Sequence, residues 1–425
     1  MENHPLLIPE LLELVLWELH TSRQDLIRCS LVTRAWTFPT QAYLFRSLHL
    51  SNRHPIELSP AAANTRLPSP EWKLLASALN SSPHLILHVR RLRITLDLLQ
   101  PDEQPETGGI SFEDAIESLS NNVDAHNAPV EALVLNIANG AGNVSPRYLA
   151  ALRGLLSVPR LQAVTFSWGH LQADNLATLW ENCAADIRHL EFIYSPGRGS
   201  NLRAAPAPED RDQITLESLS TPRLDEFSSA MGWRFDFSKL KTISTFYTDF
   251  TTQQLYATSF TAVRELRLRL PSPASGFMLP TETSGSRESR TVDLAALPNL
   301  TFLGLSFTAV AEPIQTAIKI LSTLANPSRV LKTIQFTPRP QVWEPAHSPP
   351  RPLNPNLAEV RALDDCLAAF LAPVELWVFL PPSTPPNVWR SWLRGLPKTH
   401  ARSMLCRAHK RCDCCRRPSD IVGQL

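Results

Sequence analysis

The densest group of chemically reactive side chains lies near the C-terminus of the sequence. Cysteines and one histidine alternate there with basic residues, at positions Cys406, His409, Cys412, Cys414 and Cys415. Zinc prefers thiolate and imidazole ligands, so Cys406, His409, Cys412 and Cys415 form a candidate metal set. However, the last three cysteines stand too close together to give two chelating pairs with a turn between them. The spacing therefore favours a basic tail of reduced thiols that binds no metal.

No other stretch has residues at the spacing of a known catalytic or nucleotide-binding motif. The sequence lacks the GxGxxG and P-loop glycine patterns, the GxSxG nucleophile motif and the HExxH zinc motif. Its histidines are scattered, mostly beside polar residues. We therefore expect no active site and no cofactor in this chain.

The composition argues against several classes of partner. The formal net charge is +1 over 425 residues, which gives no electrostatic reason to expect a nucleic acid or an anionic membrane. No stretch reaches the roughly 18 uninterrupted apolar residues that a membrane-spanning helix needs. The seven cysteines follow no N-terminal signal pattern, so we expect reduced thiols in an intracellular protein of the cytoplasm or the nucleus.

The first fifty residues contain two short helical patterns in close succession. Apolar residues recur at helical spacing from about Pro9 to Leu19, and again from Leu26 to Trp36. A turn over 20–23 separates the two patterns, and a strand-like FRSLHL follows them. Both apolar faces are wide, and about forty residues are too few to bury a core alone. The segment is therefore expected to bury its excess apolar surface against a partner and against the rest of the chain.

The order of these residues resembles the F-box, in the form common in fungal F-box proteins. The matching positions span both helical patterns and the strand-like exit: Leu7, Pro9, Glu10, Leu11, Val15, Leu19, Asp25, Leu26, Cys29, Ser30, Leu31, Val32, Arg34, Trp36, Leu44, Phe45, Leu48 and Leu50. Ile8 stands where the family often has a proline, and Thr33 where a cysteine or serine is common. Neither departure removes an apolar anchor. The alternative is a helical hairpin that caps an unrelated domain.

The resemblance implies that this segment binds a Skp-type adaptor and, through it, a cullin-based ubiquitin ligase. The contact residues that it implies are Leu7, Pro9, Glu10, Leu11, Leu14, Val15, Leu19, Leu26, Cys29, Leu31, Val32 and Trp36.

After a proline-rich linker over 51–70, a short unit recurs along the chain. Each copy is strand-like and has apolar residues at its first, fourth and sixth positions. The clear copies are Val89-Leu92-Ile94, Val130-Leu133-Leu135, Leu161-Val164-Phe166, Ile187-Leu190-Phe192, Val263-Leu266-Leu268, Leu300-Leu303-Leu305, Leu331-Ile334-Phe336 and Val374-Trp377-Phe379. Phe45-Leu48-Leu50 fits as a leading copy, while Leu224-Phe227 and Leu240-Ile243 are poorer ones.

Helical patterns stand between several copies, and they begin near Ser145, Asp174, Glu312 and Asn356. The alternation of strand and helix predicts a parallel sheet with right-handed crossovers. The repeated apolar triad further predicts a solenoid rather than a closed sheet. The expected fold class is therefore α/β, with an N-terminal helical hairpin followed by an irregular solenoid.

This second region resembles the leucine-rich repeat fold in a degenerate form. The spacing between copies is more variable than the usual range of about 20–29 residues. The asparagine expected three residues after the last leucine of each strand is also missing. The predicted organisation is an F-box over 1–50, a solenoid over 71–385, and a C-terminal helix with the cysteine-rich tail over 386–425. The alternative fold is an ordinary open α/β sheet.

The side chains between the members of each triad point to the opposite face of the sheet. By analogy with repeat proteins, that face is a candidate surface for a protein substrate. Its candidate contact residues are Arg93, Glu191, Arg267, Arg269 and Gln335.

These patterns together predict a non-catalytic subunit that recognises substrates for an SCF-type (Skp–cullin–F-box) ubiquitin ligase and so directs protein degradation. The identity of the substrate is not encoded in any motif. One alternative is an adaptor-binding scaffold protein without a ligase role. Another is an α/β enzyme capped by the N-terminal helices, which a cluster of perturbed carboxylates or histidines in one cleft would favour.

Overall fold

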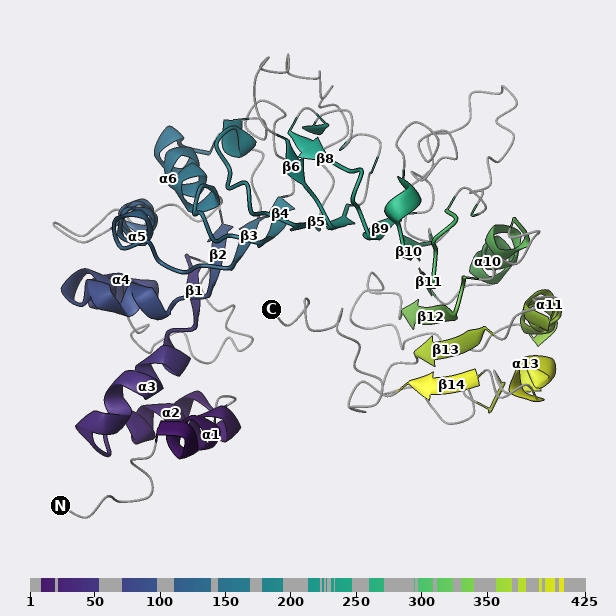
Figure 1. The fold of residues 1–425 in the computed structure, drawn as a ribbon, viewed down its shortest axis with the longest axis horizontal. Helices are drawn as coiled ribbons and strands as arrows, with labels where there is room; N and C mark the ends of the chain where they lie inside the picture. The colour runs from purple at the N-terminus through teal and green to yellow at the C-terminus, as the bar shows by residue number, and fades with distance from the viewer. Residues whose placement is uncertain are drawn as a thin grey trace, which may run out of the picture. The chain divides into compact units, whose positions relative to one another are not determined.

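The computed structural model divides into two compact units, Met1–Ile214 and Thr215–Leu425. Each unit has a mixed α/β structure built on parallel strands (Figure 1). The structure describes residues 9–19, 22–52, 71–97, 111–138, 144–168, 178–193, 213–221, 224, 227, 231–232, 234–246, 260–270, 294, 297–308, 312–323, 330–339, 357–368, 374–379, 390–391, 394–401 and 405–408. Among the helices in these ranges, none is long and apolar enough to cross a membrane.

Three helices form the N-terminal part of the first unit: α1 (Pro9–Leu19), α2 (Arg23–Ser30) and α3 (Arg34–Leu44). The first has the bounds that its leucine spacing predicts. The three helices enclose a small core of their own, made of Leu12, Leu16, Leu26 and Trp36.

The second helical pattern, expected to continue from Leu26 to Trp36, is two helices and not one. After α2, the N–H groups of Leu31 and Val32 donate to carbonyls three residues earlier, each at 3.1 Å, and form a turn. The next residue, Thr33, is extended, with φ −153° and ψ 161°, and begins α3. The predicted hairpin is therefore a three-helix unit, because a turn interrupts a run whose apolar spacing alone looks continuous.

A proline inside α3 explains why its length is not apparent from the sequence. Pro39 lies beyond the first turn, where proline normally interrupts a helix. The helix nevertheless continues to Leu44, and it places Trp36 near its start and Tyr43 and Leu44 near its end against the three-helix core. Tertiary packing at both ends therefore outweighs the local preference of the proline.

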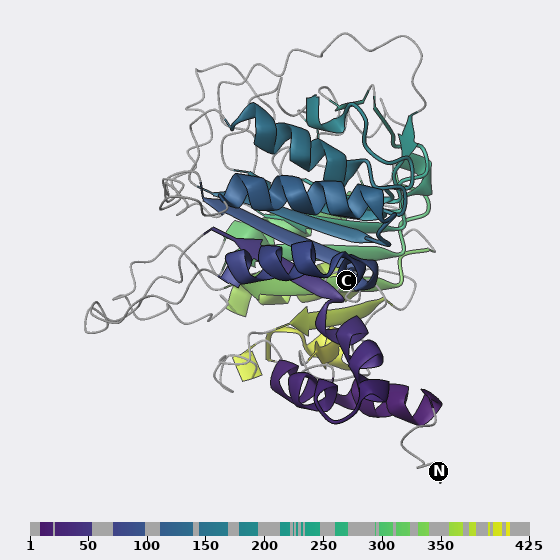
Figure 2. The ribbon, with the colours of Figure 1, turned by 90° about the vertical axis from the view of Figure 1, so that its left-hand side faces the viewer.

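The sheet of the first unit consists of parallel strands in the order of the chain. They are β1 (Ser47–Ser51), β2 (Arg91–Asp97), β3 (Ala132–Ala138), β4 (Ala163–Trp168) and β5 (His189–Phe192). Figure 2 shows the helices α4 (Glu71–Ser81), α5 (Phe112–Ala125) and α6 (Pro146–Leu156) side by side over one face of these strands. A 3₁₀ turn, η3 (Pro83–His88), leads from α4 into β2. We call the sheet face away from α4–α6 the polar face of the first unit.

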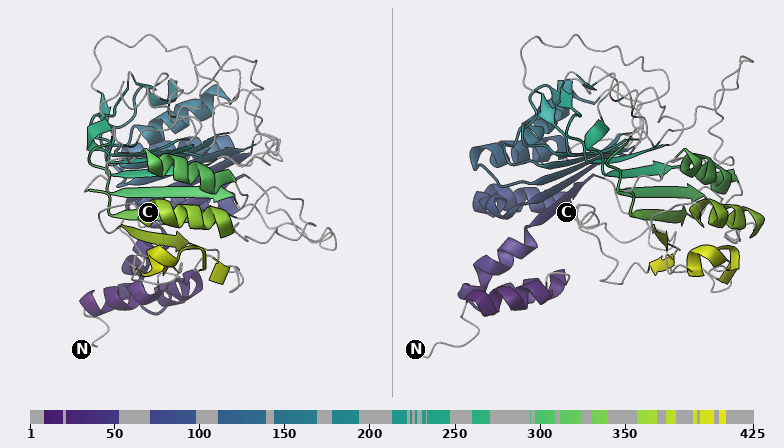
Figure 3. Two further views of the ribbon diagram at one scale, coloured as in Figure 1. Left: turned by 90° about the vertical axis from the view of Figure 1, so that its right-hand side faces the viewer. Right: turned by 45° about the vertical axis from the view of Figure 1, so that its right-hand side comes forward.

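The second unit repeats this arrangement. Its parallel strands follow in the order β7 (Ser218–Ser220), β9 (Thr242–Phe246), β10 (Glu265–Arg269), β11 (Phe302–Thr308), β12 (Thr333–Arg339), β13 (Glu375–Phe379) and β14 (Leu405–Ala408). Figure 3 shows α10 (Glu312–Ser322), α11 (Leu357–Ala368) and α13 (Pro397–Ala401) on one side of the later strands. The short strands β6 (Ile214–Thr215) and β8 (Phe235–Asp236) pair separately, and a 3₁₀ turn, η5 (Phe260–Ala262), precedes β10.

The apolar triads of β2–β5 and β10–β12 lie in the core, as the alternation predicts. None of their side chains is more than 7% exposed. The parallel sheet is likewise confirmed, because the neighbouring strands from β1 to β5 and from β7 through β9 to β14 pair in parallel. The helices expected near Ser145, Glu312 and Asn356 are α6, α10 and α11. The helix expected near Asp174 would begin on 169–177, outside the described residues, but 178–180 are helical and Leu179 and Trp180 are buried. Most of the linker falls on 53–70, which also lies outside the described residues.

The triad assigned to the β13 region is wrong by one residue. Leu376 pairs with Ile334 and Val378 pairs with Phe336, so Leu376 and Val378 are buried, at 1% and 0% exposed. Trp377 therefore lies on the opposite face, where its ring N–H donates to Glu375 Oε2 at 3.1 Å. Because side chains alternate along a strand, a shift of one residue exchanges its two faces.

Other elements differ from the sequence prediction or are missing from it. Leu224 and Phe227 are buried but helical, so they form no strand. The sequence patterns do not predict β7, β14 or the long helix α5. Two of these are short strands, whereas α5 has a recognisable start signal, a serine at 111 followed by an acidic residue three positions later.

A repeated backbone contact marks the entry to successive strands. The carbonyl of Arg46, just before β1, accepts the N–H groups of Arg90 and Arg91 at 2.9 and 3.0 Å. The carbonyls before several later strands accept two N–H groups in the same way, at Arg90, Glu131, Gln162, Glu217, Lys241, Arg264 and Thr301. The contact uses no side chain, so residues of different types occupy the position without changing the register.

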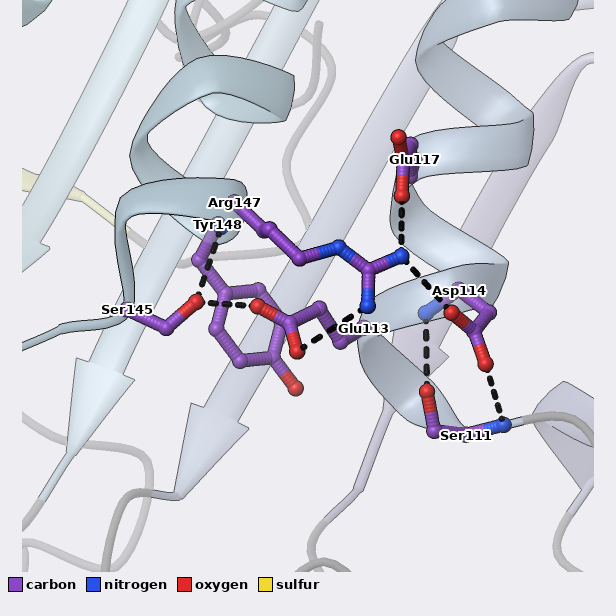
Figure 4. Close-up of polar contacts among 7 residues, drawn as sticks. All are labelled: Ser111, Glu113, Asp114, Glu117, Ser145, Arg147 and Tyr148. Atoms are coloured by element: carbon purple, nitrogen blue, oxygen red, sulfur yellow. Dashed lines mark hydrogen bonds and ion pairs between the residues drawn. The ribbon is translucent and has the colours of Figure 1, made fainter.

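The first turn of α5 is tied to α6 by the polar contacts in Figure 4. Ser111 accepts a hydrogen bond from the Asp114 N–H at 3.0 Å, and its own N–H donates to the Asp114 carboxylate at 3.1 Å. Arg147 of α6 donates to Asp114 at 2.8 Å and to Glu117, and lies 3.7 Å from Glu113. Hydrogen bonds from Ser111 and Arg147 lower the pKa of Asp114.

Ser145 completes the junction from the other helix. Its hydroxyl accepts the Tyr148 N–H at 3.3 Å, which caps α6, and donates to the Glu113 carboxylate. Further along, a side chain at Gly154 would collide with the hydroxyl of Ser120 in α5. The absence of a Cβ at Gly154 therefore lets α5 and α6 approach closely.

We predict that Ser111→Ala lowers the free energy of unfolding by about 1 kcal/mol, because α5 loses its N-cap. Asp114→Asn should also destabilise the protein at neutral pH. The lowered pKa of Asp114 contributes stability above its ordinary value near 3.8, and that contribution is lost as the pH falls through the folded-state value. Urea unfolding at several pH values should thus show the gap between wild type and Asp114→Asn closing in acid. Asp124→Asn, at the exposed end of α5, is the control, and a gap that does not depend on pH would contradict the assignment.

We predict opposite outcomes for two neighbouring residues of β13. Leu376→Ala should cost about 2–5 kcal/mol, since it opens a cavity against Ile334. Trp377→Ala should cost markedly less, although it removes a larger side chain, because Trp377 lies on the other face and is partly exposed. Urea denaturation of the full chain, followed by circular dichroism, measures both free energies of unfolding. A larger loss of stability for Trp377→Ala than for Leu376→Ala would contradict the pairing of β13 with β12.

Candidate functional site

The three-helix unit exposes several large apolar side chains. Leu14 and Trp17 of α1 are 62% and 53% exposed, and they lie one turn apart on the side opposite the buried Leu12 and Leu16. In the turn between α2 and α3, Leu31 is 81% exposed and Val32 is 62% exposed. Such exposure on so small a unit is typical of a surface that a partner covers.

The adaptor-contact residues expected from the sequence divide into two groups in the structure. The exposed members are Glu10, Leu11, Leu14, Leu31 and Val32. The members in or against the three-helix core are Val15, Leu19, Leu26, Cys29 and Trp36. Pro9 begins α1, and Leu7 lies outside the described residues. A partner can contact the first group directly, whereas the second group shapes the helices that present it.

Sequence reasoning overlooked three exposed apolar residues in this unit. They are Trp17, Ile27 and Phe38, at 53%, 44% and 65% exposed. The sequence does contain a signal for Trp17. It stands three residues after Leu14, so the two share a helix face that differs from the face of Leu12 and Leu16. Ile27 and Phe38 carry no comparable signal.

The three-helix unit continues directly into the sheet. The ring of Phe38 in α3 meets His88 of η3 edge-on, with centroids 4.9 Å apart. Burial lowers the pKa of His88, and His84 and Arg90 lower it further. Two residues after α3, the Arg46 carbonyl makes the repeated strand-entry contact. The exposed helices and the polar face thus belong to one unit.

Two of the predicted substrate-face residues share a row on the polar face of the first unit. Arg93 of β2 pairs with Val134 of β3, which pairs with Thr165 of β4, which in turn pairs with Glu191 of β5. Arg93 is exposed, and Glu191 is partly buried and accepts a hydrogen bond from the Thr165 hydroxyl at 3.3 Å. His49 of β1 begins the same row beside Arg93.

The other three predicted residues lie in the second unit. Arg267 and Gln335 share a row in which Gly304 stands between them. Arg267 bonds to Glu265 at 2.6 Å, and its guanidinium lies 5.5 Å from the centroid of the Phe302 ring. A Cβ at Gly304 would stand 3.2 Å from both Arg267 Cγ and the Phe302 ring, so glycine makes room for this stacking.

The remaining members of this group make local contacts. Gln335 donates to the Thr337 hydroxyl at 3.1 Å within β12. Arg269 ends β10, two residues beyond Arg267 on the same face. The charge of Arg267 is thus compensated by Glu265, whereas Arg93 in the first unit is exposed.

Of the four candidate metal residues, the structure describes the position of Cys406 alone. Cys406 lies in β14 opposite Trp377, whereas His409, Cys412 and Cys415 fall outside the described residues. Within the ranges that the structure describes, no group of three histidine, cysteine or acidic side chains could hold a metal ion. The cysteines at 29, 183 and 366 are in the thiol form, and burial raises the pKa of Cys366.

Comparison with known proteins does not assign the chain to a family. No family model matches the sequence, and no curated protein matches it. Two features of the molecule bear on its function: the apolar surface of α1–α3 and the polar faces of the sheets.

Proposed function

We propose that this protein is the substrate-recognition subunit of an SCF-type ubiquitin ligase. In this proposal α1–α3 form the F-box and bind a Skp-type adaptor, which links the chain to a cullin. The sheets belong to an irregular solenoid similar to leucine-rich repeats, and their polar side binds a protein substrate. The chain itself carries out no chemical step, and the ligase acts by holding the substrate near a recruited conjugating enzyme.

The main support is that the F-box pattern of the sequence coincides with helices that expose apolar side chains. Leu14, Leu31 and Val32 are among the expected adaptor contacts, and each is more than half exposed. Their burial against an adaptor would contribute roughly 25 cal/mol for each Å² of apolar surface removed from water. A partner that covers this surface explains why so small a unit keeps these residues in solvent.

The repeated strand entry supports the solenoid part of the proposal. The same carbonyl contact and the same buried triad recur from one strand to the next, as expected when each repeat contacts its neighbours. The variable connections and the missing asparagine distinguish the chain from a regular leucine-rich repeat. In a repeat protein the concave sheet surface is the usual place for a macromolecular ligand.

We predict that the double substitution Leu14→Glu and Leu31→Glu weakens binding to a purified Skp-type adaptor by tenfold or more. Both side chains are exposed, so charges there should spare the fold while disrupting an apolar interface. Isothermal titration calorimetry with the full chain measures the change. Leu74→Glu is the matched control, because Leu74 of α4 is 65% exposed and lies outside the F-box helices. Equal binding by the two variants, or no binding by the wild type, would refute the F-box assignment.

We predict that more substrate co-purifies with the variant that does not bind the adaptor than with the wild type if the protein acts in a ligase. The Leu14→Glu, Leu31→Glu variant keeps its sheets but should lose the adaptor, so its bound substrates should escape degradation. Quantitative mass spectrometry of proteins that co-purify with each form should therefore show substrates enriched on the variant. If the same proteins appear in equal amounts on both forms, an adaptor-binding scaffold role is favoured instead.

A further inference from the structure

We infer that the polar face of the first unit binds an extended peptide segment that carries an acidic residue and, about four residues away, a basic residue. The inference deepens the proposed function, because the segment would be the part of a substrate that the solenoid recognises. It concerns the row His49–Arg93–Val134–Thr165–Glu191, which crosses strands β1 to β5.

The part of this row from Arg93 to Glu191 carries opposite charges at its two ends, and His49 lies beyond Arg93 on β1. At one end Arg93 is exposed, and no ion pair or hydrogen bond engages it within the described part of the chain. Arg91, two residues earlier on the same face, adds a second positive charge, and burial together with the nearby Arg46 lowers its pKa. At the other end Glu191 supplies a carboxylate that the Thr165 hydroxyl holds in place.

The side chains between these ends are short. Val134 and Thr165 occupy the two middle positions of the row, and both are partly exposed. The preceding row has Ala132 and Ala163 at the corresponding positions, each with a single methyl group. No long side chain therefore stands between Arg93 and Glu191, and a valine methyl and a threonine face outward together as a mildly apolar floor.

Burial restricts the ligand to this part of the face. In the row that follows, Thr95 and Ser167 are 7% and 4% exposed, so they are not available to a partner, whereas Ser51 and Asn136 of that row are partly exposed. The charged side chains of the polar face that the structure describes are instead found in the row of Arg93 and in the one before it. A single extended segment that crosses the strands fits such a strip better than a broad protein surface does.

The separation of the charges sets the spacing in the ligand. Arg93 and Glu191 are three strand spacings apart, which is roughly 14 Å at about 4.8 Å for each spacing. An extended peptide advances roughly 3.3 Å for each residue, so this distance corresponds to about four residues. If an acidic residue of the peptide lies opposite Arg93, a basic residue four positions further along the peptide lies opposite Glu191.

Among the residues that the structure describes, the second unit offers no equivalent strip. Its basic residue in the corresponding row, Arg267, is only partly exposed, and it already bonds to Glu265 and stacks on Phe302. A ligand carboxylate would have to compete with Glu265 for this guanidinium. We therefore place the charge-dependent recognition in the first unit.

Selection from a random peptide library on the immobilised full-length protein tests the inference. Wild-type protein should enrich peptides with an acidic and a basic residue about four positions apart. Glu191→Lys makes both ends of the row positive, so it should enrich peptides with two acidic residues at that spacing. Arg93→Glu makes both ends negative and should enrich peptides with two basic residues.

Two neutral variants and one control refine the test. Arg93→Gln and Glu191→Gln each remove one charge, and the glutamine carbonyl keeps an acceptor for Thr165. Each should weaken the best selected peptide by up to roughly fivefold, the size expected for a partly exposed charge pair. Asp124→Lys, on the helical side of the unit, should change neither the selected sequences nor their affinity.

The outcomes separate this inference from the proposed function. Selection of peptides without a charge pattern, a pattern that does not follow the two charge reversals, or no selection at all would overturn the inference. Adaptor binding is measured on the same protein samples. Unchanged adaptor binding with no charge-dependent selection would leave the F-box assignment intact, and the reverse result would leave the peptide site without a ligase role.

Discussion

The strand arrangement in each unit depends on one backbone interaction, in which a carbonyl just before a strand accepts two N–H groups from the start of the next. It sets the register at each entry before any side chain is considered. Because the interaction needs only the main chain, the position tolerates arginine, glutamate, glutamine, lysine and threonine. Some of these side chains then pair across strands, as Arg90 does with Glu131 at 3.4 Å and Lys241 with Glu217 at 2.6 Å.

The constant register has a direct consequence for function. It lines up equivalent positions of successive strands, so that one face of each sheet receives the apolar triads and the other receives polar and charged residues. Arg93 and Glu191 are more than ninety residues apart in sequence but occupy the same row. The helices α4–α6 cover one face of the sheet in the first unit, and this row lies on the opposite face.

The three N-terminal helices combine two requirements within about forty residues. Leu12, Leu16, Leu26 and Trp36 must hold the helices together, while Leu14, Leu31 and Val32 remain outside that core. The direct passage from α3 into β1 connects this unit to the sheet without a long linker. In the proposed ligase, the adaptor would bind the three helices and a substrate segment would bind the polar face of the same unit.

Local patterns in the sequence were sufficient for the regular elements. Leucine spacing predicted α1 from Pro9 to Leu19, capping residues predicted the starts of α6 and α10, and period-two alternation predicted most buried triads. These features depend on residues a few positions apart, whose preferences hold wherever the segment lies in the fold. The same reasoning correctly placed Arg93 and Glu191 on the side away from the core, because alternation within a strand is local.

The tertiary structure decided what depends on distant partners. Pairing with β12 determined that Leu376 and Val378, not Trp377, enter the core. Packing against α1 allowed α3 to continue through Pro39, and a turn at Leu31 and Val32 exposed residues that looked like part of a helix. The sequence alone also could not separate adaptor-contact candidates that hold the three helices together from those that face solvent. Apolar character is the same in both groups, and only the packing of one helix on another decides which side chains are covered.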